Sequence, residues 1–143
     1  MGQAIAKAGD GIGPVMDTHT VTNTETGESQ PQKFPFNGNF IQSTLERNIK
    51  INGKEVATID SKVNNEPPHV PPPSYTFDSP PSNIGEVKSC KAKVLANGKK
   101  VASATDLCET CTEVPQAPPP QVQVRDQSRV YVGPPSPPST RGG

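Results

Sequence analysis

Two stretches of the chain repeat each other: Asn48-Ile49-Lys50-Ile51-Asn52-Gly53-Lys54-Glu55-Val56-Ala57-Thr58 and Lys93-Val94-Leu95-Ala96-Asn97-Gly98-Lys99-Lys100-Val101-Ala102-Ser103. Each consists of an alternating segment, an Asn-Gly pair and a short return segment that contains Val-Ala. Asn-Gly between alternating apolar residues is the strongest short-range signal for a β-hairpin, because a type I′ turn needs a positive φ at both central residues. The sequence therefore predicts two β-hairpins of the same kind.

The two ends of the chain resemble the halves of a third copy. Ala6-Lys7-Ala8-Gly9-Asp10 has the same Ala-x-Ala-x-Asp form as Ala102-Ser103-Ala104-Thr105-Asp106, and Arg129-Val130-Tyr131-Val132-Gly133 fits the ingoing strand of the other copies. One such unit is too small to bury an apolar face, whereas three units can share one. We therefore expect an all-β fold, a small pseudo-three-fold cone of three β-hairpin repeats that closes by pairing its first and last strands.

The composition predicts one small domain with a modest core. The 143 residues are 30% hydrophobic and include 18 prolines and 12 glycines, and the formal net charge is zero. We expect a domain over residues 1–133 and a proline-rich tail over 134–143. A neutral chain has no general electrostatic attraction to nucleic acid, so none is expected as a partner. The start of the chain lacks the apolar segment of a signal peptide, which indicates synthesis in the cytoplasm.

Prolines and glycines mark the segments between the repeats. The region from Gly11 to Gly38 is predicted to be loop-like, with Thr18–Thr22 as one short strand. Clustered prolines exclude helix, because each removes a backbone donor and fixes φ. They favour extended, polyproline-like straps across the surface. Straps are predicted at 64–73, 79–83 and 115–120.

Residues suited to bind a metal follow equivalent positions of the three units. Alignment on the Asn-Gly turns makes Asp10, Ser61 and Asp106 equivalent. A three-fold ring would bring the loops that follow them together at one end. Imidazole and thiolate groups that converge are typical of zinc sites, and a closed four-ligand site is structural. The candidate ligands in these loops are His19, His69, Cys108 and Cys111.

Simpler explanations exist for the same residues. A histidine in a loop is more often solvated than metal-bound, and a single Cys-x-x-Cys can be redox-active, although no βαβ pattern surrounds Cys108 and Cys111. Cys90 lies outside the ligand loops and is expected to be a small buried side chain. No recognisable set of catalytic groups is present, so we do not expect an enzyme.

The order of these motifs resembles the PAAR-like family, the sharp tip proteins of type VI secretion systems and related contractile injection machines. The family's unit of a strand, Asn-Gly-Lys, a variant of Pro-Ala-Ala-Arg and Gly-Asp is similar to residues 52–58 and 97–103. The resemblance covers roughly residues 1–133. Further matching elements are Gly9-Asp10, Asp17-Thr18-His19, Pro67-Pro68-His69, Pro80-Pro81-Ser82-Asn83 and Thr110-Cys111.

The resemblance implies a cone with structural Zn²⁺ near its apex, bound by three histidines and one cysteine. His19, His69 and Cys111 match three of these ligands. The family's third histidine lies in a His-Pro-Phe element, where this chain has Phe34-Pro35-Phe36. We therefore expect Cys108 to supply the fourth ligand, which its Cys-x-x-Cys spacing with Cys111 favours.

The resemblance also implies a structural role. Such a tip caps a trimeric β-helical spike, touches a target membrane transiently as it helps to puncture it, and offers an attachment point for effector cargo. It acts at the end of the apparatus, outside the producing cell or inside the target cell. The alternative is a free-standing zinc-binding adaptor whose prolines at 134–138 bind a partner. A solvated linker would explain the same tail.

Overall fold

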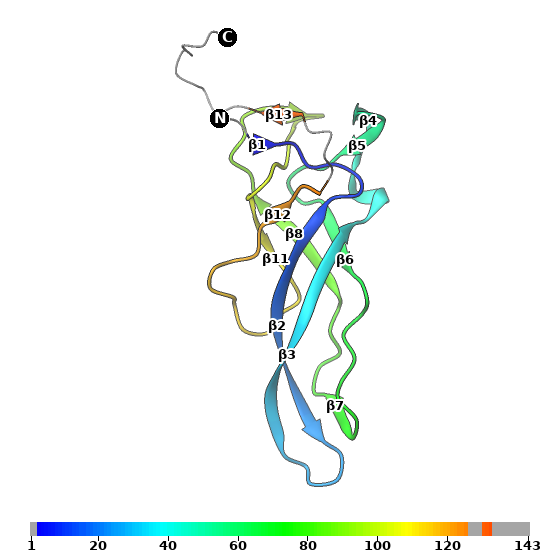
Figure 1. Cartoon of the computed structure of the whole chain (residues 1–143), viewed down its shortest axis with the longest axis vertical. Coiled ribbons are helices and arrows are strands. Elements are labelled where there is room, and N and C mark those ends of the chain that lie inside the picture. The colour runs from blue at the N-terminus through cyan, green and yellow to red at the C-terminus, as the bar shows by residue number, and fades with distance from the viewer. Residues whose placement is uncertain (1–2, 126–129, 133–143) are drawn as a thin grey trace.

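The computed structural model describes residues 3–125 and 130–132, and its regular structure is almost all β (Figure 1). This confirms the predicted all-β class. Within the described residues, the helical structure is limited to the short 3-10 turn η1 (Gln42–Thr44). The strands are β1 (Gln3–Ala4), β2 (Gly11–Asn23), β3 (Ser29–Phe40), β4 (Glu46–Ile51), β5 (Lys54–Val56), β6 (Lys62–Asn65), β7 (Tyr75–Phe77), β8 (Ile84–Ser89), β9 (Leu95–Ala96), β10 (Lys99–Lys100), β11 (Leu107–Glu109), β12 (Val122–Gln123) and β13 (Tyr131–Val132).

Both Asn-Gly hairpins form as predicted. β4 pairs with β5 and β9 pairs with β10, each antiparallel. At the turns, Asn52 and Gly53 have φ of 52° and 79°, and Asn97 and Gly98 have φ of 53° and 85°. Two successive positive φ values are what a type I′ turn requires, so the turn chemistry of the sequence decides the local structure.

The third hairpin is assembled from the two ends of the chain. β1 pairs antiparallel with β13, with Ala4 opposite Tyr131. The backbone N–H of Ile5 extends this pairing by donating to the carbonyl of Val130 at 2.7 Å. The predicted closure between the first and last strands is therefore confirmed.

The return strands of the three hairpins join in a closed ring of backbone hydrogen bonds. Ala6 donates to the carbonyl of Ala102 at 2.9 Å, Ala102 to Ala57 at 2.9 Å, and Ala57 to Ala6 at 3.0 Å. All three alanines are fully buried, and their small side chains let three strands approach one another. Single β-bridges flank the ring between Ile5 and Ser103, Lys7 and Val56, and Thr58 and Val101.

The chain leaves the ring through the same turn in every unit. Asp10, Ser61 and Asp106 are buried, and each accepts a hydrogen bond through its side chain from the backbone N–H three residues before it. Their predicted equivalence is thus confirmed. The donors are Lys7 at 3.0 Å, Thr58 at 2.9 Å and Ser103 at 2.7 Å.

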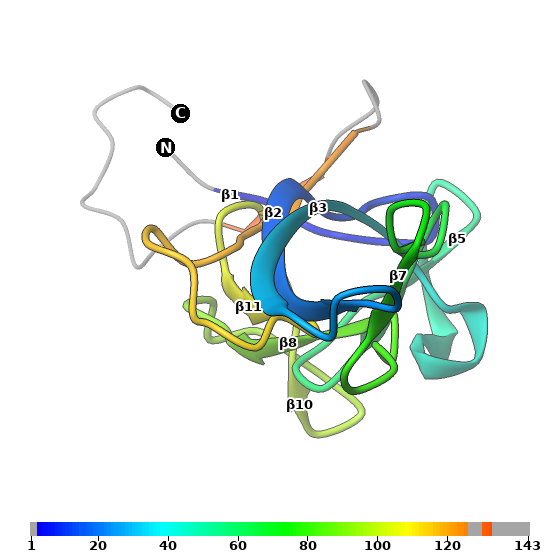
Figure 2. The same ribbon diagram turned by 90° about the horizontal axis from the view of Figure 1, so that it is seen from below.

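A curled sheet extends from the ring toward the narrow end of the molecule (Figures 1 and 2). Its strand order is β11-β8-β6-β3-β2-β12, and β7 pairs with the far part of β2. One cluster of buried side chains connects the ring alanines to Ile12, Phe36, Val63 and Val87 of the sheet. Ring and sheet therefore share a single core.

The region from Gly11 to Gly38 corrects the prediction of a loop, because it forms most of the two longest strands, β2 and β3, although the short strand predicted over Thr18–Thr22 does lie within β2. The register shifts between Ile12 and Val15, so Gly13-Pro14 is accommodated in a bulge. Pro31 and Pro35 lie where β3 pairs only with β2, and an edge strand tolerates prolines whose missing donor would face away from the partner. The proline clusters of the three predicted straps lie outside strands, but the first strap starts later than predicted, because residues 64 and 65 belong to β6.

Among the described residues, no helix has the length and hydropathy needed to cross a bilayer.

Candidate metal centre

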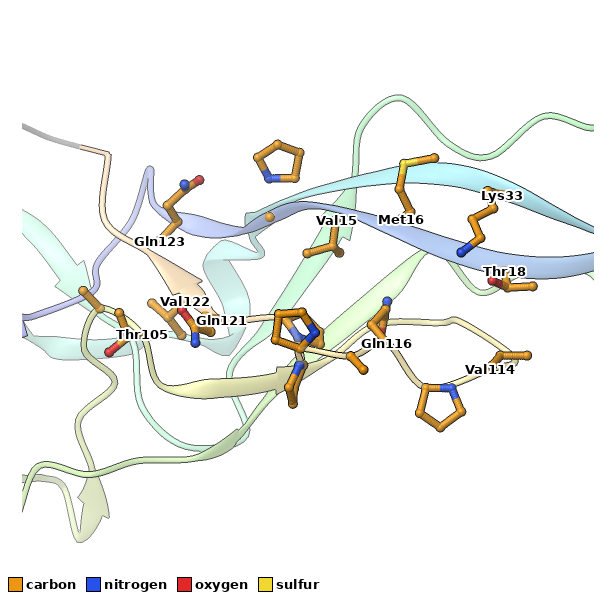
Figure 3. Close-up of a pocket in the computed structure, with 18 of the residues that line it drawn as sticks. Val15, Met16, Thr18, Lys33, Thr105, Val114, Gln116, Gln121, Val122 and Gln123 are labelled. Atoms are coloured by element: carbon orange, nitrogen blue, oxygen red, sulfur yellow. The ribbon is translucent and has the colours of Figure 1, made fainter.

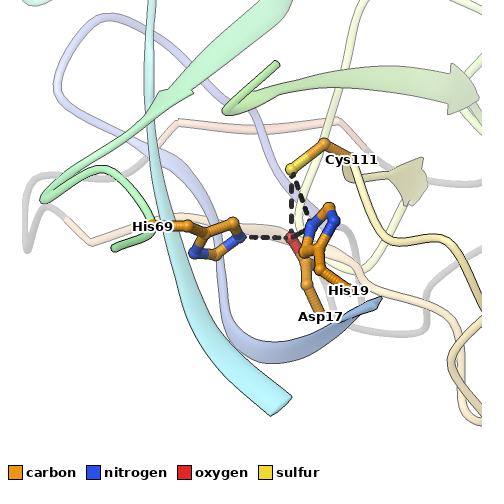
Figure 4. A group of neighbouring side chains, drawn as sticks. All are labelled: Asp17, His19, His69 and Cys111. Carbon is orange, nitrogen blue, oxygen red and sulfur yellow. Dashed lines mark hydrogen bonds and ion pairs between the residues drawn. The ribbon is translucent and has the colours of Figure 1, made fainter. Parts of the chain in front are cut away.

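Strand β2 places two candidate ligands on the same face. Successive side chains of a strand point to opposite sides, so Asp17, His19 and Val21 point the same way. All three are buried, whereas Thr18 and Thr20 between them are partly exposed. The strand therefore presents a carboxylate and an imidazole side by side to the interior (Figure 4).

The other two candidates come from segments without regular structure. His69 lies in the strap that follows β6, and its backbone N–H donates to Asn83 Oδ1 at 2.9 Å. Cys111 follows β11, in a loop that is fastened to β2. The Thr18 N–H donates to Thr112 Oγ1 at 2.8 Å, and the Glu113 N–H donates to the Thr18 carbonyl at 2.9 Å. Three distant parts of the sequence thus meet at one point.

The geometry of Asp17, His19, His69 and Cys111 suits a metal ion. Their ligand atoms all lie within 4.8 Å of one another. Asp17 Oδ2 lies 2.9 Å from His69 Nε2 and 3.3 Å from Cys111 Sγ. His19 Nε2 lies 3.5 Å from Cys111 Sγ and 4.0 Å from Asp17 Oδ2. Tetrahedral zinc with ordinary bond lengths separates its ligand atoms by about 3.3–3.6 Å, so these four groups could hold one ion after small adjustments.

Aromatic side chains enclose the group on one side. The ring centroids of Phe34 and Phe77 lie 6.0 and 5.8 Å from that of His19. The centroid of Phe34 also lies 5.4 Å from that of His69. On the polar side, Gln116 Nε2 donates to Asp17 Oδ1 at 2.9 Å, and the Thr110 hydroxyl donates to the same oxygen. Asp17 Oδ1 is therefore occupied by protein donors, and Oδ2 faces the cluster.

Cys111 is held as a thiol in the absence of a metal. Burial and the nearby Asp17 carboxylate raise the pKa of Cys111 to about 11. A metal binds the thiolate, so binding must release this proton.

Cys108 differs from its predicted role, because it does not belong to the group. It lies on β11 opposite Val87 of β8, packs in the apolar core and is 4% exposed. Its Sγ faces the Asp106 carbonyl at 3.6 Å, and burial raises its pKa to about 12. Cys108 lies within β11, whereas Cys111 lies three residues later, beyond the end of the strand. The two thiols therefore point to different places. Cys90 is buried as expected, at 7% exposure.

Asp17 takes the place that was predicted for Cys108. The sequence feature that indicates Asp17 as a candidate ligand is its spacing of two residues from His19 in a Thr-rich alternating stretch. This spacing puts both side chains on one face of a strand. The prediction of a loop for this region concealed that signal.

A cavity of about 780 Å³ lies between the 114–124 segment and strand β2 (Figure 3). Its described lining is mostly proline, valine and glutamine, with Lys33 as the one charged side chain and no histidine, cysteine or carboxylate. It offers neither metal ligands nor an acid–base pair. The Asp17, His19, His69 and Cys111 group is therefore the stronger candidate for a functional site.

Comparisons with protein-family models, curated proteins and solved structures give no match for this chain.

Replacing Cys111 with serine should lower zinc affinity by more than about 100-fold, beyond the 10–100-fold typical of changes outside the ligand set. Cys108→Ser is the matched control and should keep its zinc, because its thiol faces the core. Zinc content after dialysis and competition with a chelator measure both variants. An equal loss of zinc affinity in the two variants would show that Cys108 is a ligand after all.

Zinc affinity should rise with pH, by about tenfold per unit between roughly pH 7 and 9, because the Cys111 thiol must lose one proton on binding. The pKa of Cys111 is raised to about 11, so the thiol stays protonated over this whole range when no metal is bound. Chelator competition at several pH values measures the slope. An affinity that does not change with pH would show that the thiol does not bind as thiolate.

Proposed function

We propose that the chain is the metal-stapled tip of a contractile injection system and caps its trimeric β-helical spike. The observation that carries this proposal is the closed ring of Ala6, Ala57 and Ala102, which gives a single chain pseudo-three-fold symmetry. A monomer with this symmetry can present three similar surfaces to the end of a trimer. The resemblance of the repeats and of the ligand positions to the PAAR-like family supports the same role.

Exposed apolar side chains on the hairpins support a docking face. Leu95 in β9 is 59% exposed, and Val94 just before it is 49% exposed. Tyr131 and Val130 hold the corresponding place in the split hairpin and are 54% and 40% exposed. Exposed apolar side chains at corresponding places on two of the three hairpins would be covered by a partner protein that docks on them. The hairpin ends also carry strand edges that a β-helical partner would cover.

The tapered shape and the metal centre support a mechanical role. The molecule narrows from the end with β1, β13, β4 and β5 to the β2–β3 turn (Figure 1). Structural zinc contributes on the order of 10–16 kcal/mol in small peptides at neutral pH. That exceeds the whole stability of many domains, about 5–15 kcal/mol. One ion bound between β2 and the 110–113 loop, with the 66–73 strap held to the same centre by the hydrogen bond from His69 to Asp17, would resist unfolding of the narrow half. The proposal gives the ion this structural role and no catalytic one.

The chain should co-migrate with the trimeric spike protein of its own system in size-exclusion chromatography, at one tip per trimer. Exchange of Leu95 and Tyr131 for aspartate should weaken the complex by about tenfold or more, because charges would be buried at the contact. Val70→Asp is the matched control, since Val70 is 72% exposed but lies in the strap beside the metal centre.

Equal weakening by Val70→Asp would place the contact elsewhere on the molecule. Migration of the wild-type chain as a free monomer beside the spike would contradict the proposal and favour the zinc-binding adaptor.

A further inference from the structure

The positions of the protons in the metal centre follow from two carboxamides, that of Asn65, which is buried, and that of Asn83, which is partly buried. Asn65 Oδ1 accepts the backbone N–H of Asn37 at 2.8 Å, and Asn65 Nδ2 donates to Asn83 Oδ1 at 3.0 Å. Asn83 Oδ1 also accepts the backbone N–H of His69 at 2.9 Å. A backbone amide can only donate, so both carboxamide orientations are fixed.

This orientation decides the tautomer of His69. Asn65 Nδ2 points at His69 Nδ1 at 3.2 Å, and an amide NH₂ can only donate. Nδ1 must therefore carry the lone pair, and the proton of the neutral imidazole is on Nε2. His69 Nε2 lies 2.9 Å from Asp17 Oδ2, a carboxylate oxygen that accepts this proton in a hydrogen bond.

His19 has the opposite arrangement. Its Nδ1 is buried, makes no hydrogen bond to any described residue, and lies 3.4 Å from Glu113 Oε2. Glu113 is held in place because its Oε1 accepts the backbone N–H of Thr20 at 3.0 Å. A carboxylate beside Nδ1 favours the proton there, which leaves a lone pair on Nε2. That atom faces Cys111 Sγ and Asp17 Oδ2.

We propose that the two histidines have different roles. His19 Nε2, Asp17 Oδ2 and Cys111 Sγ bind the ion, and His69 is a positioning residue that donates its Nε2–H to Asp17. Glu113 favours the proton on His19 Nδ1 through its charge, at 3.4 Å. This inference rests on the proposed metal centre and assigns a role to each residue within it. Metal-bound groups are commonly oriented by such outer hydrogen bonds.

The alternative, coordination through His69 Nε2, requires a local conflict. The proton would have to move to Nδ1, where it would face the N–H of Asn65 with no acceptor between them. Turning the Asn65 amide would remove this conflict but would set its NH₂ against the Asn37 N–H and its oxygen against Asn83 Oδ1. A cavity of about 290 Å³ borders His19 and Cys111, so a water molecule can reach the centre and complete its coordination.

Long-range ¹H–¹⁵N NMR of the full chain, free and zinc-loaded at mildly alkaline pH, tests the proposal directly. His69 should keep its proton on Nε2 and an unprotonated Nδ1 in both states. His19 should show a protonated Nδ1 in both states, and its Nε2 resonance should shift on zinc loading. Loss of the Nε2 proton from His69 on loading, with a shifted Nε2 resonance, would overturn the proposal.

Substitutions supply a second readout. His69→Gln keeps an N–H donor near Asp17 and should lower zinc affinity by no more than about 100-fold, as expected for an outer hydrogen bond. His19→Gln removes a ligand and should lower it by clearly more. Equal losses would make His69 a ligand. If the substituted chains fail to fold, the NMR measurement on the unaltered protein decides. A wild-type chain that binds no zinc would instead contradict the metal centre itself, a separate and recognisable outcome.

Discussion

Three backbone hydrogen bonds among Ala6, Ala57 and Ala102 are the contact on which the rest of the structure depends. Each return strand donates to one neighbour and accepts from the other, so the ring satisfies its own backbone polar groups in the interior. A chain with only 30% hydrophobic residues cannot rely on a large apolar core. The ring includes Ala6, and β1 just before it pairs with β13, so both ends of the domain are tied to the same unit.

The ring also sets the direction in which each unit continues. The matched turns at Asp10, Ser61 and Asp106 send three segments into one curled sheet with its straps. The side chains of Asp17, His19, His69 and Cys111 on these segments then converge beside the aromatic rings of Phe34 and Phe77. Weak shielding by solvent strengthens electrostatic interactions there. A divalent cation with the Asp17 carboxylate and the Cys111 thiolate would form a neutral centre, which suits a buried position.

The sequence predicted the ring more accurately than the metal centre, for a physical reason. Asn-Gly turns such as Asn52-Gly53 act through local backbone preferences, so their hairpins could be located without knowledge of the fold. Strands β2 and β3 could not, because Pro31 and Pro35 are acceptable only at a sheet edge, and the edge depends on the complete topology. Assigning this region as a loop hid Asp17, and treating Cys-x-x-Cys as a ligand pair overlooked that Cys108 faces the core. The meeting of His19, His69 and Cys111 at one place could be predicted, because the repeats show which distant loops lie at equivalent positions.

The central claim is that one metal ion binds between β2 and the 110–113 loop, at a centre to which His69 also fastens the 66–73 strap. Elemental analysis of the purified chain, combined with thermal unfolding before and after chelation, tests it most directly. The account predicts one zinc ion per chain and a markedly lower melting temperature once the ion is removed, with recovery when zinc is returned. A chain that contains no metal after purification from zinc-supplemented medium, and whose melting temperature is the same with zinc and with chelator, would contradict it.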